Sequence, residues 1–227
     1  MKAFVTDVFF DLDHTLWDFE KNSALTFKQI LNDNKVNIKL EDFLGIYIQK
    51  NFEFWKLFRE EKITKEKLRY LRLKDTFEEL NYKVEDELIN KLSDDYIGNL
   101  STYNHLIKNA MEILNYLKPK YKLHIITNGF EEVQKAKIMN SNIQHFFIHI
   151  INSDMAGVKK PHPAIFELAL NKAKIGPENT VMIGDSLEAD IIGAKNVGMN
   201  TIFFDVYKKF THDDVVVNDL LEIKSYL

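Results

Sequence analysis

The chain has 227 residues, enough for one large core or for a core that carries a smaller inserted domain. Hydrophobic residues make up 45% and charged residues 28%, as in ordinary globular proteins, and the formal net charge of −4 argues against nucleic acid as a partner. No apolar stretch reaches membrane-spanning length and cysteine is absent, so we expect no membrane partner and a reducing, cytoplasmic setting.

The first predicted element is a buried strand from Phe4 to Phe10, followed by Asp11-Leu12-Asp13-His14-Thr15. Residues two apart on an extended segment point to the same side, so the Asp11 and Asp13 carboxylates are expected to lie together. Two such acids repel each other unless a cation or a shared proton holds them. An isolated pair of this kind is ordinarily an acidic surface turn. The motifs that occur later in the chain favour a catalytic role for these two aspartates instead. His14 is interpreted as a loop residue.

Residues 20 to 98 contain no convincing strand and are predicted to form three or four helices. The segment from Glu41 to Arg59 carries two apolar stripes, which predicts packing against two partners. The stripes are Leu44, Ile48, Phe52 and Trp55 on one side and Phe43, Tyr47, Phe54 and Phe58 on the other. We expect residues 18–99 to form an inserted α-helical cap, with hinges at Asp18-Phe19 and in the polar stretch from Asn99 to Asn104.

Strands and helices alternate through the rest of the chain. Strands are predicted at Leu123 to Ile126, Phe146 to Ile151, Val181 to Ile183 and Thr201 to Phe204. Helices are predicted at Leu106 to Leu117, Glu131 to Met139, Ala164 to Ala173 and Ala189 to Val197. Continuous apolar strands joined by helices are typical of a parallel sheet covered on both faces, in a doubly wound α/β fold. Residues 1–17 and 100–227 are therefore expected to form this core, with ligands at the carboxyl ends of its strands.

Polar motifs follow three of the later strands. They are Thr127-Asn128-Gly129, Lys159-Lys160-Pro161 and Gly184-Asp185-Ser186-x-x-x-Asp190. Singly, each motif is ordinarily a turn, a solvated loop or a helix cap. Because the carboxyl ends of parallel strands meet at one edge of a sheet, these motifs are expected to converge with Asp11 and Asp13 on a single pocket.

The order of these motifs resembles that of the haloacid dehalogenase superfamily over essentially the whole chain, and the helical insertion resembles its C1 cap subclass. The stretches Phe10 through Leu16, Ile126 through Phe130, and Asn51-x-x-x-Trp55 through Ile63-Thr64 resemble the pyrimidine 5'-nucleotidase branch. One departure concerns the second hinge. Many relatives carry Pro-Gly before the helix that re-enters the core, and here Tyr103-Asn104-His105 stands in that place.

Hydrolysis of a phosphate ester needs positioning and charge neutralisation, and a carboxylate nucleophile divides it into two easier steps. By the resemblance, Asp11 is the nucleophile, and Asp13 is the general acid and then the general base. Lys160, which directly precedes Pro161, supplies positive charge, with Lys159 as the rival candidate.

The resemblance also implies how phosphate and metal are held. The Thr127 hydroxyl and the Asn128 N–H bind phosphoryl oxygens. An all-oxygen site suits Mg²⁺, with the Asp11 carboxylate, the Asp13 backbone carbonyl and Asp185 as ligands. Asp190 contributes to the metal site through a water molecule, or by contacting the ligands without contacting the ion itself.

Substrate specificity is expected to come from the insertion. Trp55 could stack on a base and Asn51 could hydrogen-bond a pyrimidine edge, although both also suit structural roles. Further aromatic candidates are Trp17, Phe19, Phe52 and Phe54.

The predicted function is Mg²⁺-dependent hydrolysis of a small phosphorylated metabolite through an aspartyl phosphate, with a nucleoside 5'-monophosphate favoured and a monomer or homodimer expected. A phosphatase of sugar phosphates, a sugar phosphomutase and a catalytically silent phosphate-binding module stay open. A dehalogenase is disfavoured because its reaction has no use for Asp13 or for an acidic metal site.

Overall fold

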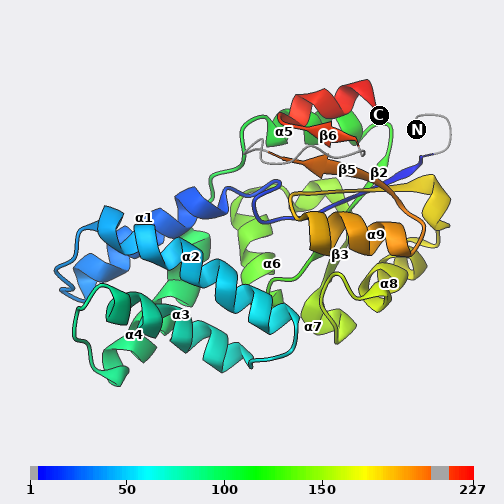
Figure 1. The fold of residues 1–227 in the computed structure, drawn as a ribbon. Helices are drawn as coiled ribbons and strands as arrows, with labels where there is room; N and C mark the ends of the chain where they lie inside the picture. The colour runs from blue at the N-terminus through cyan, green and yellow to red at the C-terminus, as the bar shows by residue number, and fades with distance from the viewer. Residues whose placement is uncertain (1–4, 206–214) are drawn as a thin grey trace. The chain divides into compact units, whose positions relative to one another are not determined.

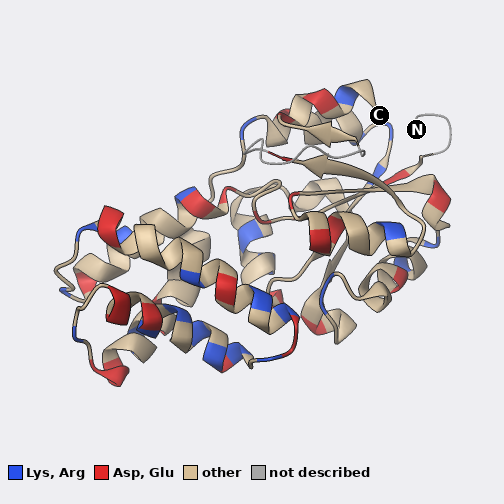
Figure 2. Cartoon of the chain, in the orientation of Figure 1, with Lys and Arg blue, Asp and Glu red and all other residues tan. Residues whose placement is uncertain are grey.

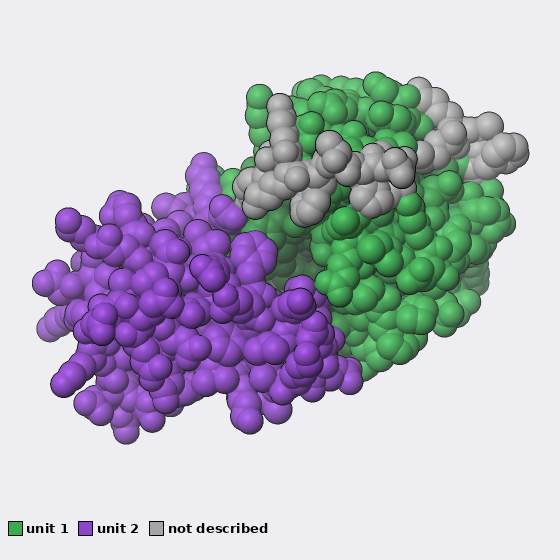
Figure 3. Space-filling model, in the orientation of Figure 1, with its two compact units in different colours: residues 1–19, 104–227 green, residues 20–103 purple. Residues whose placement is uncertain are grey.

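The computed structural model describes residues 5–205 and 215–227. The chain divides into two compact units, residues 1–19 with 104–227 and residues 20–103, which we call the core unit and the insert unit (Figure 3). The insert unit is the region in which the sequence predicts a helical insertion at 18–99, and its action as a cap stays a prediction. Every helix in the described ranges is too short or too polar to cross a membrane.

The core unit is built on a six-stranded parallel sheet in the order β3-β2-β1-β4-β5-β6 (Figure 1). The strands are β1 Asp7–Phe10, β2 Lys122–Thr127, β3 Phe147–Asn152, β4 Thr180–Gly184, β5 Asn200–Phe204 and β6 Val216–Val217. This confirms the expected α/β core. The predicted start at Phe4 lies outside the described residues, and Phe146 belongs to a 3₁₀ turn. The sixth strand, β6, is not predicted by the sequence, because two residues are too few to show a periodicity.

Helices cover the sheet of the core unit. They are α5 Ala110–Leu117, α6 Glu131–Asn140, α7 Ser153–Ala156, α8 Pro163–Ala173 and α9 Gly193–Asn196, which a π-helical turn, Leu187–Ile192, precedes. One buried cluster joins Phe9 of β1 and Met182 of β4 to Phe166 of α8 and Ala194 of α9. Burial of this apolar surface holds the helices against the strands.

The helix predicted from Leu106 begins later, at Ala110. Leu106 instead forms an antiparallel bridge with Trp17, and the Ile107 N–H donates to the Leu16 carbonyl at 2.9 Å. A bridge of this kind requires extended rather than helical backbone at Leu106, so the helix starts only after it. Asn109 precedes the helix in the left-handed conformation, at φ 67°.

Four α-helices and one short 3₁₀ helix, Leu100–Thr102, make up the insert unit. The α-helices are α1 Phe19–Asp33, whose first residue belongs to the core unit, α2 Leu40–Arg59, α3 Lys65–Glu79 and α4 Asp86–Asn99. On α2, Phe43 and Tyr47 are buried, with ring centroids 4.8 and 4.4 Å from Phe27 of α1. The other stripe of α2 is more open, since Ile48 is 37% and Phe52 53% exposed. A small helical bundle offers α2 one inner face, so one stripe is fully buried rather than two.

Charged residues of both signs are interspersed over the insert helices (Figure 2). Lys50 on α2, for example, pairs with Glu79 at the end of α3 at 2.9 Å. Such exposed pairs contribute little to stability. The mixture of signs is that of a solvated helical surface.

Candidate active site

The motif residues gather at the carboxyl edge of the core sheet. Phe10 lies level with Ile125 of β2 and Ile183 of β4, and the Asp11 N–H continues the ladder by donating to the Ile183 carbonyl at 2.9 Å. Parallel register therefore brings Asp11 to the same edge as Thr127, the last residue of β2, and Asp185, which follows β4. The convergence expected from the sequence is present in the core unit.

The Lys160 ammonium is buried and lies among three oxygens. It donates to Asp11 Oδ1 at 2.5 Å, to Asp190 Oδ1 at 2.6 Å and to the Ile126 carbonyl at 2.7 Å. Burial acts to lower the pKa of Lys160, but the Asp11 and Asp190 carboxylates outweigh it and raise this pKa above its ordinary value. The lysine therefore stays charged beside Asp11.

The Asn128 side chain fixes the backbone of Lys160. Its Oδ1 accepts from the Lys160 N–H at 2.7 Å and its Nδ2 donates to the Lys160 carbonyl at 3.0 Å. The neighbouring Lys159 is only half-buried. The motif predicts a role only for the backbone N–H of Asn128, and this contact of its side chain was not expected.

Asp11, Asp185 and Asp190 form a compact acidic group, with one carboxyl oxygen from each lying within 4.8 Å of the others. Burial, reinforced by the other two acids and opposed by Lys160, raises the pKa of Asp11 well above its ordinary value. Burial and the Asp190 carboxylate raise the pKa of Asp185 to about 7. Three acids beside one ammonium leave excess negative charge, and an all-oxygen donor set suits a hard divalent cation, so the group fits a metal ion.

Asp190 belongs to this acidic group, and its expected contribution through water or through contact with the ligands stays a prediction. Its Oδ1 accepts from Lys160, and its Oδ2 accepts from the Ser186 N–H at 3.0 Å. Thr15 donates from Oγ1 to Asp185 Oδ1 at 3.2 Å. These bonds orient the carboxylates before any ligand binds.

Asp13 is held by two residues of α6. Lys137 Nζ donates to Oδ1 at 2.6 Å, and Gln134 Nε2 donates to Oδ2 at 2.9 Å. Gln134 Nε2 also donates to Thr127 Oγ1 at 2.7 Å. Neither residue belongs to a motif in the sequence, although Gln and Lys three positions apart on one face of a predicted helix are a detectable signal.

Thr127 is buried and its hydroxyl oxygen accepts two hydrogen bonds, from Gln134 and from the Gly129 N–H at 3.2 Å. A hydroxyl has one hydrogen to donate in addition to its acceptor sites. With its oxygen satisfied, the Thr127 hydroxyl has its own hydrogen left to donate, and its expected donation to a phosphoryl oxygen stays a prediction.

The aromatic and amide candidates have defined surroundings. Trp17 is fully buried, and Lys137 Nζ lies 4.4 Å from its ring centroid. Within the insert unit, Asn51 is buried and accepts from Arg72 Nη1 at 2.9 Å. Trp55 is half-buried and lies edge-on to Phe58 at 5.6 Å. A role of Asn51 or Trp55 in specificity stays a prediction.

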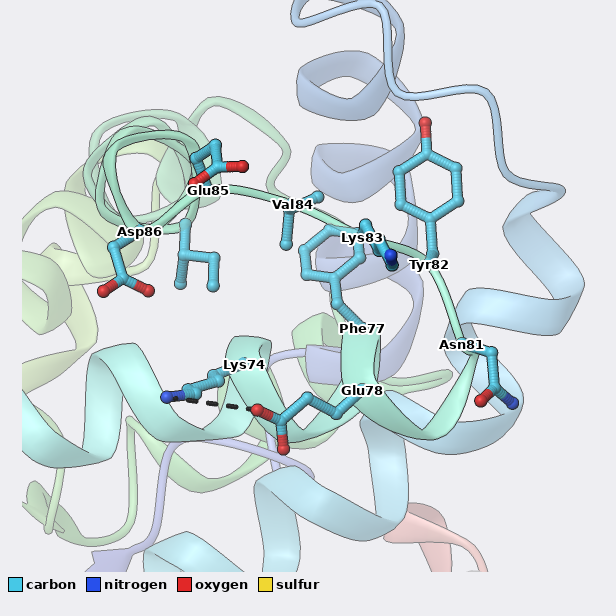
Figure 4. Close-up of a pocket in the computed structure, with 10 residues that line it drawn as sticks. Lys74, Phe77, Glu78, Asn81, Tyr82, Lys83, Val84, Glu85 and Asp86 are labelled. Carbon is cyan, nitrogen blue, oxygen red and sulfur yellow. Dashed lines mark ion pairs between the residues drawn. The ribbon is translucent and has the colours of Figure 1, made fainter.

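A separate hollow of about 600 Å³ lies within the insert unit (Figure 4). It is lined by the end of α3, the loop that follows and the start of α4, including Lys74, Phe77, Tyr82 and Asp86. None of the candidate catalytic residues lines it. This hollow is therefore distinct from the acidic group.

Comparisons with known proteins agree on one family. The model of a haloacid dehalogenase-like hydrolase family matches residues 8–198. The crystal structure of the putative HAD-hydrolase YfnB from Bacillus subtilis, bound to magnesium, has a TM-score of 0.89, 27% identity and 98% coverage of both chains.

Two curated relatives that align over nearly the whole chain carry different names. Pyrimidine 5'-nucleotidase YjjG from Escherichia coli is 29% identical over 225 residues, which cover 97% of this chain and 96% of that protein. Glyceraldehyde 3-phosphate phosphatase from Methanothermobacter thermautotrophicus is 30% identical over 237 residues, which cover 97% of this chain and 98% of that protein. Both names describe phosphatases of small metabolites.

Proposed function

This chain belongs to the haloacid dehalogenase-like hydrolases, and we propose that it hydrolyses small phosphate monoesters through a phosphoryl group carried on Asp11. The observation that carries the proposal is the contact of the Lys160 ammonium with Asp11 Oδ1 at 2.5 Å within a buried acidic group. An ammonium so placed offsets the repulsion between the carboxylate and an anionic ester.

The proposed reaction has two steps. In the first, an Asp11 oxygen attacks phosphorus, the bond from phosphorus to the leaving oxygen breaks, and Asp13 gives that oxygen a proton. In the second, water attacks phosphorus, Asp13 takes a proton from the water, and the bond from phosphorus to Asp11 breaks. Inorganic phosphate leaves, and both aspartates return to their starting states.

The remaining residues of the site are proposed to bind the phosphoryl group and to neutralise its charge. Thr127 Oγ and the Asn128 N–H are the proposed donors to the phosphoryl oxygens. Asp11, the Asp13 backbone carbonyl and Asp185 are the proposed ligands of Mg²⁺, with Asp190 beside them, and the bound ion would neutralise phosphoryl charge. The magnesium-bound YfnB relative and the acidic group support this assignment.

For the substrate, we propose a nucleoside 5'-monophosphate, which the motif resemblance and the nucleotidase relative support. Trp55 and Asn51 are the proposed specificity residues. Glyceraldehyde 3-phosphate or a similar small sugar phosphate is the second candidate, because the relative of that name aligns over the same length. The cytoplasmic setting and the monomeric or homodimeric state remain predictions.

The test is phosphate release from a panel of nucleoside 5'-monophosphates and sugar phosphates, with Mg²⁺ or EDTA, for wild type and Asp11→Asn. We expect metal-dependent release that favours pyrimidine nucleotides and falls by at least about 10⁴-fold in Asp11→Asn, because the nucleophile is lost.

Other outcomes select the alternatives. Release mainly from triose or sugar phosphates would support the proposed mechanism but contradict the proposed nucleotide substrate. Transfer of phosphate within a sugar, detected by product analysis, would identify a phosphomutase. No turnover of any compound would favour a silent phosphate-binding module.

A further inference from the structure

We propose that Lys137 and Gln134 on α6 are positioning residues, which hold the Asp13 carboxylate where it exchanges a proton with the leaving group. The inference rests on the proposed function, in which Asp13 is the general acid and base. It adds two residues that lie outside the motifs and more than a hundred positions from Asp13 in the sequence.

Lys137 is buried and contacts Asp13 directly. Its side chain is 3% exposed, its ammonium lies 2.6 Å from Asp13 Oδ1, and the Trp17 and Phe19 ring centroids lie 4.4 and 5.2 Å away. A buried ammonium is costly unless it is paired, and aromatic faces stabilise a cation. These surroundings keep Lys137 directed at Asp13, whose side chain is 22% exposed.

Gln134 links Asp13 to Thr127, the proposed phosphate-binding residue at the end of β2. Its amide nitrogen donates hydrogen bonds to both Asp13 Oδ2 and Thr127 Oγ1. Its buried Oε1 has no partner among the described atoms. Leaving a buried oxygen without a hydrogen bond is costly. We infer that this cost is tolerated because the amide nitrogen makes its two hydrogen bonds, to Asp13 and Thr127, only in this position.

Gly129 makes room for this amide. A Cβ built on Gly129 would lie 2.3 Å from Gln134 Cδ and 2.5 Å from Nε2. Any larger residue at 129 would therefore push Gln134 off Asp13. This is a second observation, independent of the hydrogen bonds, that the site is built around the placement of Gln134.

The two donors fix the carboxylate without blocking it. Lys137 takes one oxygen of Asp13 and Gln134 takes the other, and each oxygen keeps a second lone pair for a proton. With both oxygens anchored, rotation of the side chain is restricted, and misplacement of a catalytic group by even 1 Å can slow a reaction about 100-fold.

The experiment compares two substrates that differ in their need for an acid. The p-nitrophenolate ion leaves without a proton, whereas an alkoxide needs one. The kcat/KM value reports the steps up to loss of the leaving group, so it isolates the first proton transfer. We would measure kcat/KM for p-nitrophenyl phosphate and for the best alkyl phosphate of the panel, in wild type, Lys137→Met, Lys137→Arg, Gln134→Leu and Asp13→Asn. Lys135→Met, an exposed position on the same helix, is the matched control.

We expect Lys137→Met and Gln134→Leu to lower kcat/KM about 10- to 100-fold for the alkyl phosphate and less than about 3-fold for p-nitrophenyl phosphate. Asp13→Asn should show the same asymmetry with a larger loss, Lys137→Arg should recover part of the activity, and Lys135→Met should match wild type. Retained activity on p-nitrophenyl phosphate also shows that the variants fold.

Equal losses on both substrates in Lys137→Met and Gln134→Leu would overturn the inference, because a structural defect has no leaving-group preference. So would unchanged activity in both variants. If Asp13→Asn itself lost activity equally on both substrates, the acid role of Asp13 would fail. If wild type turned over neither compound, the proposed function would fail, and this inference with it.

Discussion

Burial raises the pKa of two carboxyls of the acidic group, Asp11 and Asp185, and the effect on pH dependence is best defined for Asp185. The pKa of Asp185 rises to about 7 and that of Asp11 rises well above its usual range. A carboxyl whose pKa is raised by folding stabilises the protein below its unfolded pKa of about 3.9, and this contribution is lost as pH rises through the folded pKa. The metal-free protein should therefore lose stability between about pH 4 and pH 7.

Mg²⁺ bound at the proposed site would displace protons from this acidic group, so its affinity should depend on pH. Below pH 7 the ion must displace protons, and we expect its apparent affinity to fall about tenfold per pH unit for each proton displaced. Titration calorimetry at pH 8 and pH 6 measures this directly, with proton release read from buffers of different ionisation enthalpy. Equal affinity at both pH values would contradict it.

Asp185→Asn is the informative variant for this prediction. It removes one of the mutually repelling acids, so the metal-free protein should become more stable at pH 8 while Mg²⁺ binding is lost. Asp94→Asn on the exposed side of α4 is the matched control and should change neither. Thermal denaturation with and without Mg²⁺ provides both readouts.

At the scale of secondary-structure elements, the end of β4 and the following π-helical turn approach each other closely at Gly184. A Cβ built there would lie 2.3 Å from Asp190 Oδ2 and 2.7 Å from Asp190 Cβ. Asp190 is itself buried and bonded to Lys160 and to the Ser186 N–H. The glycine therefore lets the turn bring Asp190 into the acidic group.

Gly184→Ala should displace Asp190 and, through it, the Lys160 ammonium. We expect a loss of about 100-fold in kcat, the size associated with a misplaced catalytic group, measured as phosphate release. Gly45→Ala on α2 is the control, since nothing lies within 4 Å of a Cβ there. That change should stabilise the protein by about 0.5–1 kcal/mol, as alanine does relative to glycine in a helix, and leave kcat unchanged. Wild-type activity in Gly184→Ala would show that Asp190 can move without consequence.

On the scale of the whole molecule, the chain offers a separate probe of each compact unit. Of its two tryptophans, Trp17 belongs to the core unit and Trp55 to the insert unit. Chains with more than one compact unit often depart from a single cooperative transition. A ligand stabilises the unit that binds it, by about 2.7 kcal/mol at one hundred times its dissociation constant.

Mg²⁺ should therefore raise the unfolding midpoint of the core unit more than that of the insert unit. The measurement follows tryptophan fluorescence during urea unfolding of Trp55→Phe, which retains Trp17, and of Trp17→Phe, which retains Trp55. Equal shifts in the two variants would show that both units unfold as one.

The sequence by itself determined five of the six strands, the α/β core and the residues at its carboxyl edge. Continuous apolar runs mark buried strands, and parallel register then brings Asp11, Thr127 and Asp185 to one edge whatever the details of packing. Local patterns carry this information because neighbours in the sequence are also neighbours in a strand or helix.

Only the tertiary structure decided which distant side chains meet. Lys137 lies 124 positions and Gln134 lies 121 positions from Asp13. The start of α5 at Ala110 likewise depends on pairing of residues 106–107 with residues 16–17. Such contacts depend on how helices pack against the sheet, and burial then shifts the pKa of Asp11 and Asp185 by desolvation, which the order of residues alone does not reveal.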